Sequence, residues 1–281
     1  MTQAIKILTL IDVIFILFLI ASGSTAGILS DVIYYIGFLV PVFIGYRASG
    51  KLKWQREEER GLAEASDRLL EIKKGTVGFI LPLIAPTVAT IFVSAFLTSL
   101  ALSSFGFSSA PVENVPLAEM IIVNALAPAL LEELLFRYIP MKLIMPYSKR
   151  WCLLLSSLYF ALIHCSLFQI PYALIAGVIF IVIDMMSGSI WPSVILHFIN
   201  NLLSVIWIKY CTNPRAVWIF TLILGVCALI SLIFALITFN KKYKAKIKGV
   251  LDKGESFKPT YSPIALAVIS LYIAVLNLLS K

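Results

Sequence analysis

The sequence predicts an all-α fold, a polytopic bundle of about eight or nine transmembrane helices, and three observations support this prediction. The 281 residues are 60% apolar and only 14% charged, whereas a typical soluble domain is about 45–50% apolar and about 25% charged. The mean hydropathy is +0.96. Long apolar runs also recur along the chain, and in lipid such runs form helices because each backbone polar group must be satisfied within its own segment.

Nine apolar runs are close to the ~20 residues that a helix needs to cross a bilayer. They cover residues 5–21, 27–46, 77–101, 117–139, 150–168, 170–187, 190–208, 216–239 and 261–279. The first run resembles a secretory signal with a small-residue cleavage site at Ala21–Gly23. Because many further spans follow, we expect it to remain as an uncleaved first helix.

Three parts of the chain follow from this pattern. Residues 1–116 form N-terminal transmembrane helices with a charged cytoplasmic helix near 51–74, which we expect to be solvated or to lie at the membrane interface. Residues 117–208 form a helical core that carries most of the intramembrane polar residues. Residues 209–281 form C-terminal helices with a basic loop over 240–260.

The distribution of basic residues predicts the orientation of a multi-pass protein of the cell membrane. The net charge is +8, and Lys and Arg gather in the loops 47–76, 140–150 and 240–260, whereas 102–116 has none. With nine spans and a cytoplasmic N-terminus, all three basic loops face the cytoplasm, as the positive-inside bias requires. We therefore expect these loops to contact anionic lipid headgroups, and we expect no nucleic-acid partner.

Ionisable side chains inside the predicted spans are the strongest functional signal, because such groups are costly in a membrane and tend to be functional. They are Asp12, Glu119, Glu132, Glu133, Arg137, His164, Asp184 and His197. A lone buried histidine is more often a hydrogen-bonded core residue. Here both histidines of the chain lie in spans, near a carboxylate pair and an arginine, and this combination favours a site.

Two adjacent glutamates have different predicted environments. Glu133 and Arg137 are four residues apart, so on a helix they face each other and can form an ion pair. Glu132 then points about 100° away and remains available for other chemistry. In the alternative, both acids pair with Arg137, which leaves one negative charge unmatched in a low-dielectric setting.

The next span carries His164 at a depth similar to that of Glu132, counted from the turn between the two spans. A carboxylate beside an imidazole is a suitable pair for activating water, because the carboxylate takes a proton while the imidazole orients the water. We therefore interpret Glu132 and His164 as a water-activating pair.

His197 and Asn201 lie four residues apart on a later helix, where an imidazole N–H and an amide N–H can converge on an oxyanion. An interhelical hydrogen bond is the alternative. Asp184 precedes a glycine-containing turn and is expected to hold this helix. His197 is only about seven residues past that turn, shallower than His164, so the turn must be recessed or the helix tilted. A recessed turn would open a water-filled cavity toward the cytoplasm.

Three motifs on successive helices resemble the CAAX-protease and bacteriocin-processing family of membrane peptidases, which includes the eukaryotic type II CAAX prenyl endopeptidases. The motifs are Glu132-Glu133-x-x-x-Arg137, Phe160-x-x-x-His164 and His197-x-x-x-Asn201. The resemblance covers roughly residues 117–208, and the first three and last two spans show no motif. Each motif alone is weak, and their order and spacing inside spans make the set specific.

The resemblance implies an intramembrane endopeptidase in which Glu132 and His164 activate the attacking water. It implies that His197 and Asn201 stabilise the tetrahedral oxyanion. Three further residues would support the architecture, namely Glu133, Arg137 and Phe160.

The residues do not decide whether a metal ion takes part in the reaction. The family is commonly described as metalloproteases, and Glu132, His164 and His197 form an acceptable zinc set. The chain has no His-Glu-x-x-His helix, however, and these three ligands would come from three helices. We favour a metal-free, glutamate-activated water.

The substrate implied by the resemblance is a peptide or lipidated peptide, either a prenylated CAAX sequence or a peptide pheromone or bacteriocin, taken from the cytosol. Two other functions are consistent with the same residues. One is a non-catalytic immunity or scaffolding protein on this fold, which the intact motifs disfavour. The other is a small proton-coupled transporter, which is disfavoured because transporters often show two corresponding halves and here the polar residues form one block.

Overall fold

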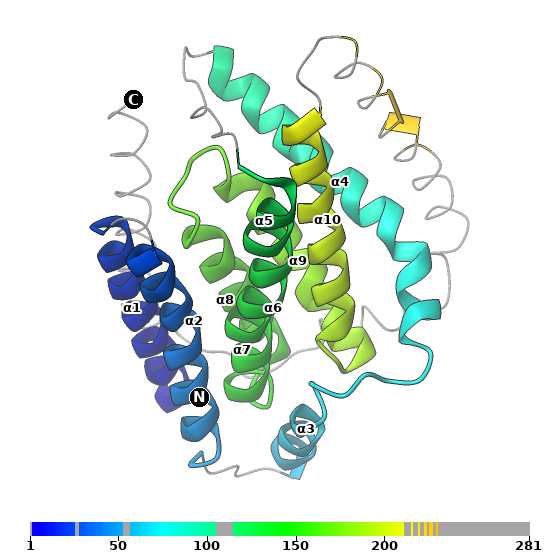
Figure 1. Ribbon diagram of the computed structural model, residues 1–281. Coiled ribbons are helices and arrows are strands. Elements are labelled where there is room, and N and C mark those ends of the chain that lie inside the picture. The colour runs from blue at the N-terminus through cyan, green and yellow to red at the C-terminus, as the bar shows by residue number, and fades with distance from the viewer. Residues whose placement is uncertain are drawn as a thin grey trace.

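The computed structural model describes residues 2–25, 28–52, 57–104 and 115–210, and the isolated residues 215, 219, 222, 223, 225, 226 and 229. The regular secondary structure of this described part is entirely helical (Figure 1), which confirms the all-α prediction. The predicted spans over 216–239 and 261–279 and the basic loop over 240–260 lie outside the described residues, apart from the isolated positions in 219–229.

Helices α1 (Thr2–Gly23) and α2 (Ile28–Ser49) form an antiparallel hairpin at one side of the bundle (Figure 1). Aromatic packing holds the hairpin together and joins it to the core. The ring centroid of Phe15 lies 4.6 Å from that of Phe38 in α2 and 5.8 Å from that of Phe136 in the core. Gly45 permits a close approach, because a Cβ there would lie 2.8 Å from a methyl carbon of Ile139. The hairpin therefore packs tightly on the helix that carries the Glu132 motif.

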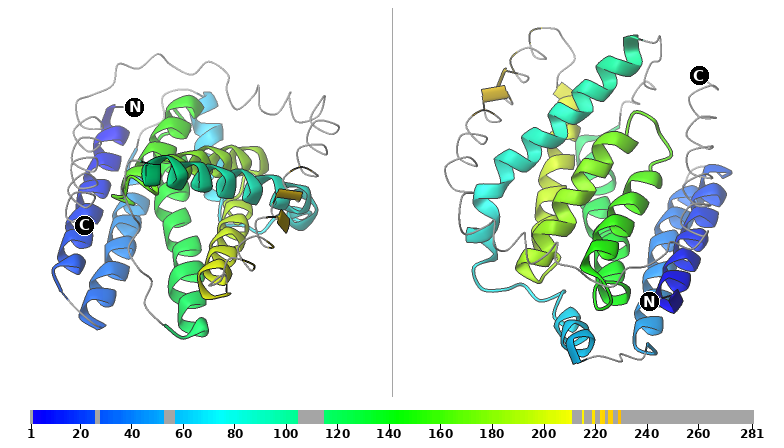
Figure 2. Two further views of the ribbon diagram at one scale, coloured as in Figure 1. Left: turned by 90° about the horizontal axis from the view of Figure 1, so that it is seen from above. Right: turned by 180° about the vertical axis from the view of Figure 1, so that it is seen from behind.

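The predicted charged helix is present as α3 (Glu57–Asp67), which is shorter than the 51–74 expected. It lies at one end of the bundle (Figure 1). The exposed carboxylate of Asp67 pairs with the buried Lys142 at 2.5 Å, so α3 is tied to the core. The long helix α4 (Thr76–Ser104) runs obliquely across α9 and α10, as both views in Figure 2 show.

Residues 117–143 form one continuous helical run with two π-helical segments. Its parts are α5 (Leu117–Ile121), η1 (Ile122–Leu126), α6 (Ala127–Glu133), η2 (Leu134–Tyr138) and α7 (Ile139–Leu143). Pro128 and Pro140 explain the irregularity, because proline has no N–H to donate to the carbonyl four residues earlier. Ser156 of the next helix donates to the Phe136 carbonyl, which Pro140 leaves without its usual partner.

Helices α8 (Lys149–Leu162), α9 (Ile170–Ser187) and α10 (Trp191–Tyr210) complete the described core. The span predicted over 150–168 is too long, because α8 has 14 residues and covers roughly 21 Å at 1.5 Å per residue. That length is less than the ~30 Å of a bilayer's hydrocarbon core. Helix α9 ends at Gly188, whose φ of +66° is a left-handed conformation that glycine adopts without strain.

Five of the described helices are long and apolar enough to cross a membrane, namely α1, α2, α4, α9 and α10. They expose large apolar side chains, such as Leu17, Phe43 and Leu81, each at least 60% accessible. Surfaces of this kind require lipid and not water around them. The chain is thus a multi-pass membrane protein; a total of eight or nine spans, the division into three parts and the cytoplasmic N-terminus stay predictions.

Candidate active site

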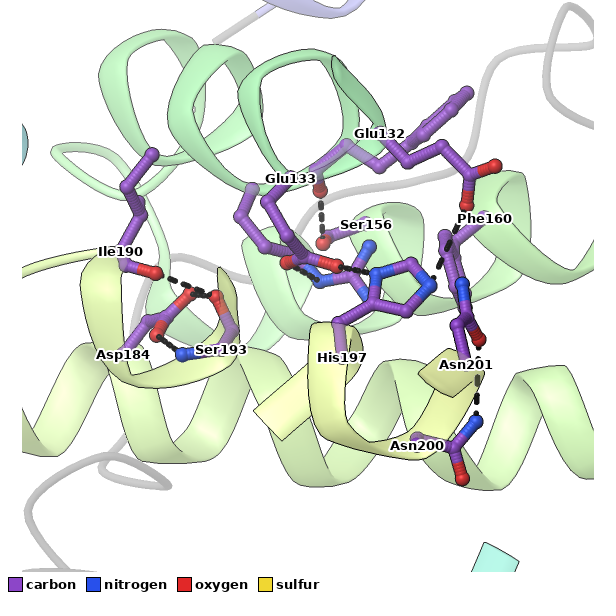
Figure 3. Close-up of polar contacts among 12 residues, drawn as sticks. Glu132, Glu133, Ser156, Phe160, Asp184, Ile190, Ser193, His197, Asn200 and Asn201 are labelled. Atoms are coloured by element: carbon purple, nitrogen blue, oxygen red, sulfur yellow. Dashed lines mark hydrogen bonds and ion pairs between the residues drawn. The ribbon is translucent and has the colours of Figure 1, made fainter. Parts of the chain in front are cut away.

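Glu133 is the centre of a buried ionic network (Figure 3). Its side chain is fully buried, and Oε2 lies 3.2 Å from Nε of Arg137 one helical turn later. The ion pair that the spacing predicts is therefore present. The other oxygen, Oε1, accepts a hydrogen bond from Nδ1 of His197 at 2.8 Å. Glu133 thus joins the first motif to the third.

Arg137 is fully buried, and aromatic rings cover its charge. Its guanidinium carbon lies 4.0 Å from the ring centroid of Phe160 and 5.5 Å from that of Phe180. Rings at these distances attract a cation through their quadrupole. Phe180 was not among the predicted site residues, because no motif marks a phenylalanine within the uniformly apolar sequence of α9.

Glu132 has a different environment from its neighbour, as the helical geometry predicts. Its Oε2 lies 3.8 Å from Nε2 of His197, and this oxygen has no hydrogen-bond partner among the described residues. Glu132 also lines a cavity, whereas Glu133 does not. A buried carboxylate oxygen without a partner, in a residue that lines a cavity, calls for a ligand such as water.

His164 lies in the turn just after α8 and is oriented by the last turn of that helix. Its Nδ1 donates to the carbonyl of Phe160 at 2.8 Å, because a carbonyl can only accept. The neutral imidazole then has its lone pair on Nε2. The ring of Phe160 packs edge-on to both imidazoles, at 5.2 Å from His164 and 5.7 Å from His197. Phe160 therefore contacts both histidines, and the supporting role expected for it stays a prediction.

Asn201 lies one turn after His197 on α10, and both side chains line the cavity. The sequence interpretation missed Asn200, which is buried and donates from Nδ2 to Oδ1 of Asn201 at 3.3 Å. This hydrogen bond occupies the oxygen of the Asn201 amide and leaves its N–H₂ group as the donor for a ligand. The adjacent asparagines in the sequence were the available signal.

Asp184 fixes the start of α10, as expected. Its carboxylate accepts from the backbone N–H of Ser193 at 3.2 Å and from the Ser193 hydroxyl at 2.7 Å. Both residues are fully buried. Because His197 follows one turn later, this pair fixes the position of the imidazole relative to α9.

The turn between α9 and α10 is closed, and the expectation that it opens a cavity is wrong. Residues 69–71, which follow α3, cover it through three hydrogen bonds. They are Ile190 N to Leu69 O at 2.9 Å, Ser189 Oγ to Glu71 O at 2.8 Å and Trp191 Nε1 to Leu70 O at 2.8 Å. His197 and His164 nevertheless line one cavity.

A cavity of about 580 Å³ brings the predicted residues together. Four of its lining residues are those expected to act on a peptide, namely Glu132, His164, His197 and Asn201. Tyr34 of α2 and Tyr172 of α9 line the same cavity and lie within electrostatic range of Glu132. Neither tyrosine belongs to a motif, and only the packing of the helices brings them here.

The side chains of Glu132, His164 and His197, in the positions they occupy here, do not form a metal site. Among the described residues, no three His, Cys, Asp or Glu side chains come close enough together to hold one. The side chains of this site are therefore considered for chemistry of their own.

Comparison with known families supports the resemblance that the motifs indicate. Residues 114–203 match the family described as type II CAAX prenyl endopeptidase Rce1-like. The matched segment contains all three motifs, and the family is one of proteases. No curated protein and no solved structure gives a significant match to the chain.

Proposed function

We propose that this chain is an intramembrane endopeptidase that hydrolyses a peptide bond with a water activated by Glu132 and His164. The observation that carries the proposal is the convergence of Glu132, His164, His197 and Asn201, from three helical segments, on one cavity. A carboxylate, an imidazole lone pair and an amide donor are the groups that peptide hydrolysis needs.

In the first step, Glu132 takes a proton from water as the water oxygen attacks the peptide carbonyl. His164 accepts a hydrogen bond at Nε2 from the same water, since its Nδ1–H is held by the Phe160 carbonyl. The proton on Glu132 then passes to the leaving amine. Glu132 is thereby returned to its carboxylate form at the end of the cycle, as general acid–base catalysis requires.

The oxyanion is stabilised by Asn201 and His197. Because Nδ1–H of His197 is used by Glu133, a second donor at Nε2 exists only when the ring is protonated. Glu132 lies 3.8 Å from Nε2 of this ring, and Glu133 lies 2.8 Å from Nδ1. A donor of this kind is worth about 10²–10³ in kcat.

The substrate we propose is a peptide or a membrane-associated chain, with CAAX-like, pheromone and bacteriocin sequences as the candidates. Apolar and aromatic side chains line most of the cavity, among them Ile91, Phe92, Ala173, Phe180 and Val205. Such a lining suits an apolar or lipidated segment. The basic loops would contact anionic lipid headgroups and so hold the protein in an anionic membrane.

The test is turnover of lipidated and unlipidated reporter peptides by detergent-solubilised protein. We expect Glu132→Gln and His164→Ala each to lower kcat by at least about 10²-fold, the contribution typical of positioned acid–base groups. Glu119→Gln is the matched control, because Glu119 lies exposed on the same helical run outside the cavity. Activity retained in a chelator would support metal-free chemistry. Turnover that survives both substitutions would refute the proposed site.

A further inference from the structure

The segment that follows α3 is bonded through its backbone to the turn between α9 and α10. The successive carbonyls of residues 69–71 accept from Ile190 N at 2.9 Å, from Trp191 Nε1 at 2.8 Å and from Ser189 Oγ at 2.8 Å. Polar groups near a helix end lack partners within the helix, and they are costly when buried. Because Ser189 and Ile190 are buried, this contact supplies the partners that the turn needs.

Lys73 attaches the same segment to the same turn a second time. Its Nζ donates to the Ser187 carbonyl at 3.0 Å. A Cβ at position 188 would lie 2.5 Å from that Nζ, so the absence of a side chain on Gly188 makes room for the lysine. The glycine therefore serves both the left-handed end of α9 and the approach of Lys73.

The other end of the segment is attached to the 117–143 run. Asp67, the last residue of α3, pairs with Nζ of Lys142 in α7 at 2.5 Å. Lys142 is buried, and its Nζ lies 5.6 Å from the ring centroids of both Tyr46 and Tyr138. A buried ammonium stays where its partners are, because leaving them would cost its remaining solvation. This attachment is therefore fixed on the side of the core.

Residues 67–73 thus join the end of the 117–143 run to the start of α10, at the end of the bundle where α3 lies (Figure 1). The same two helical segments meet again in the site, where Glu133 and Glu132 lie 2.8 Å and 3.8 Å from His197. His197 is in the second turn of α10, about 9 Å along the axis from its start. A shift of the α10 start would therefore move the imidazole with it.

We propose that residues 67–73 form a brace that sets the position of His197 in the site. The proposal rests on the proposed function for its effect on turnover. Neither this segment nor the turn 187–191 lines the cavity, so the brace acts without touching the peptide. The side chains of Trp191 and Ser189 are thus positioning groups for the imidazole.

The position of His197 can be followed without any catalysis, because the chain has only two histidines. The full chain is labelled with [15N]histidine and studied by NMR in detergent, and His164→Ala assigns the two rings. Nδ1 of His197 donates to the buried carboxylate of Glu133. A charge-assisted hydrogen bond of this kind is short and strong, so we expect its proton to give a downfield signal that exchanges slowly with water.

The double variant Ser189→Ala with Trp191→Phe removes two side-chain donors of the brace and keeps the backbone bond from Ile190. We expect the His197 signal to move upfield or to be lost to exchange with water. Trp207→Phe is the control, because it makes the same change near the far end of α10 and outside the cavity lining, and it should keep the signal. An unchanged His197 signal in the double variant would overturn the proposal, even if thermal stability fell.

Turnover of the reporter peptides gives the second measurement. We expect kcat of the double variant to fall about ten- to hundredfold with KM within about twofold, since a misplacement of about 1 Å can cost about 10²-fold. Asp67→Asn tests the other attachment on an exposed side chain and should lower kcat about two- to fivefold, the range of an exposed ion pair. Glu64→Gln removes the same charge from an exposed position of α3 and should not. A higher KM with unchanged kcat would contradict the proposal.

The two measurements separate this inference from the proposed function. A wild type that cleaves no peptide would refute the peptidase, and the His197 signal would still decide whether the brace exists. A wild type that cleaves, with kcat unchanged in a double variant that has lost the signal, would leave the peptidase standing and refute the positioning role.

Discussion

The core that carries the motifs and the α1–α2 hairpin both bury a carboxylate, but they treat it in opposite ways. In the core, Glu133 meets a cation and an imidazole, and Asp184 accepts two hydrogen bonds from Ser193. In the hairpin, Asp12 is 3% exposed, and neither of its oxygens has a hydrogen-bond partner among the described residues. All three were equally unusual in the sequence, and only their partners distinguish them.

This difference shows which intramembrane charges belong to a site. A charge taken out of water is costly unless donors or an opposite charge replace the lost solvation. Glu133 and Asp184 have such replacement, and each one positions His197. Asp12 has none in the described part of the chain, so we interpret it as a burden on stability without a catalytic role.

Removing the cation should have the largest effect on stability. Arg137→Met leaves Glu133 buried without its ion pair, and breaking such a pair from one side costs about 3–5 kcal/mol. We expect little folded protein in a thermal unfolding assay in detergent, and no turnover, because Glu133 also orients His197.

Two further variants make this prediction specific. Replacing both partners, Arg137→Met with Glu133→Met, should recover most of the lost stability, since an apolar pair of similar volume often substitutes well for a buried ion pair. Arg47→Met, at the exposed end of α2, should leave unfolding unchanged. If the double variant unfolded as early as Arg137→Met, the charge would not be the cause.

An intermediate effect is expected for Asp184, whose partners are neutral. Asp184→Asn replaces a carboxyl oxygen that accepts from Ser193 by an amide N–H₂ and should cost about 1–3 kcal/mol. Because α10 then loses its fixed start, we also expect kcat on the reporter peptide to fall more than KM rises. Ser193→Ala keeps the backbone N–H that bonds Asp184 and should therefore be milder. A loss from Ser193→Ala as large as that from Asp184→Asn would contradict this order.

Much of the site could be predicted from the sequence because its residues are rare in an apolar chain. The i, i+4 spacing alone predicted the Glu133–Arg137 pair, and a short list of polar residues contained His164 and His197. Local pattern could not reveal that His197 bonds Glu133, because 64 residues separate them. Phe180 and Tyr34 are invisible among similar apolar and aromatic neighbours, and only tertiary packing brings them to the site.

The fold was predicted less well where an apolar run continues beyond the end of the helix. The apolar sequence continues past Leu162, so hydropathy extended the span to 168, whereas α8 ends at Leu162. Hydropathy also gives no information on the side from which a cavity opens. That property depends on how the helix ends pack, as at the α9–α10 turn, where Ser189 and Ile190 are buried.

The smallest effect is expected for Asp12, and its sign distinguishes it from the core carboxylates. Asp12→Leu replaces a buried carboxylate that has no hydrogen-bond partner in the described residues with an apolar group on the buried face of α1. We expect thermal stability to stay equal or to rise, because the desolvation cost disappears, and turnover to stay within about twofold. Asp12→Asn keeps a polar group and should gain less than Asp12→Leu. A marked loss of stability or activity in Asp12→Leu would mean that Asp12 has a partner outside the described residues, and the contrast between the two regions would fail.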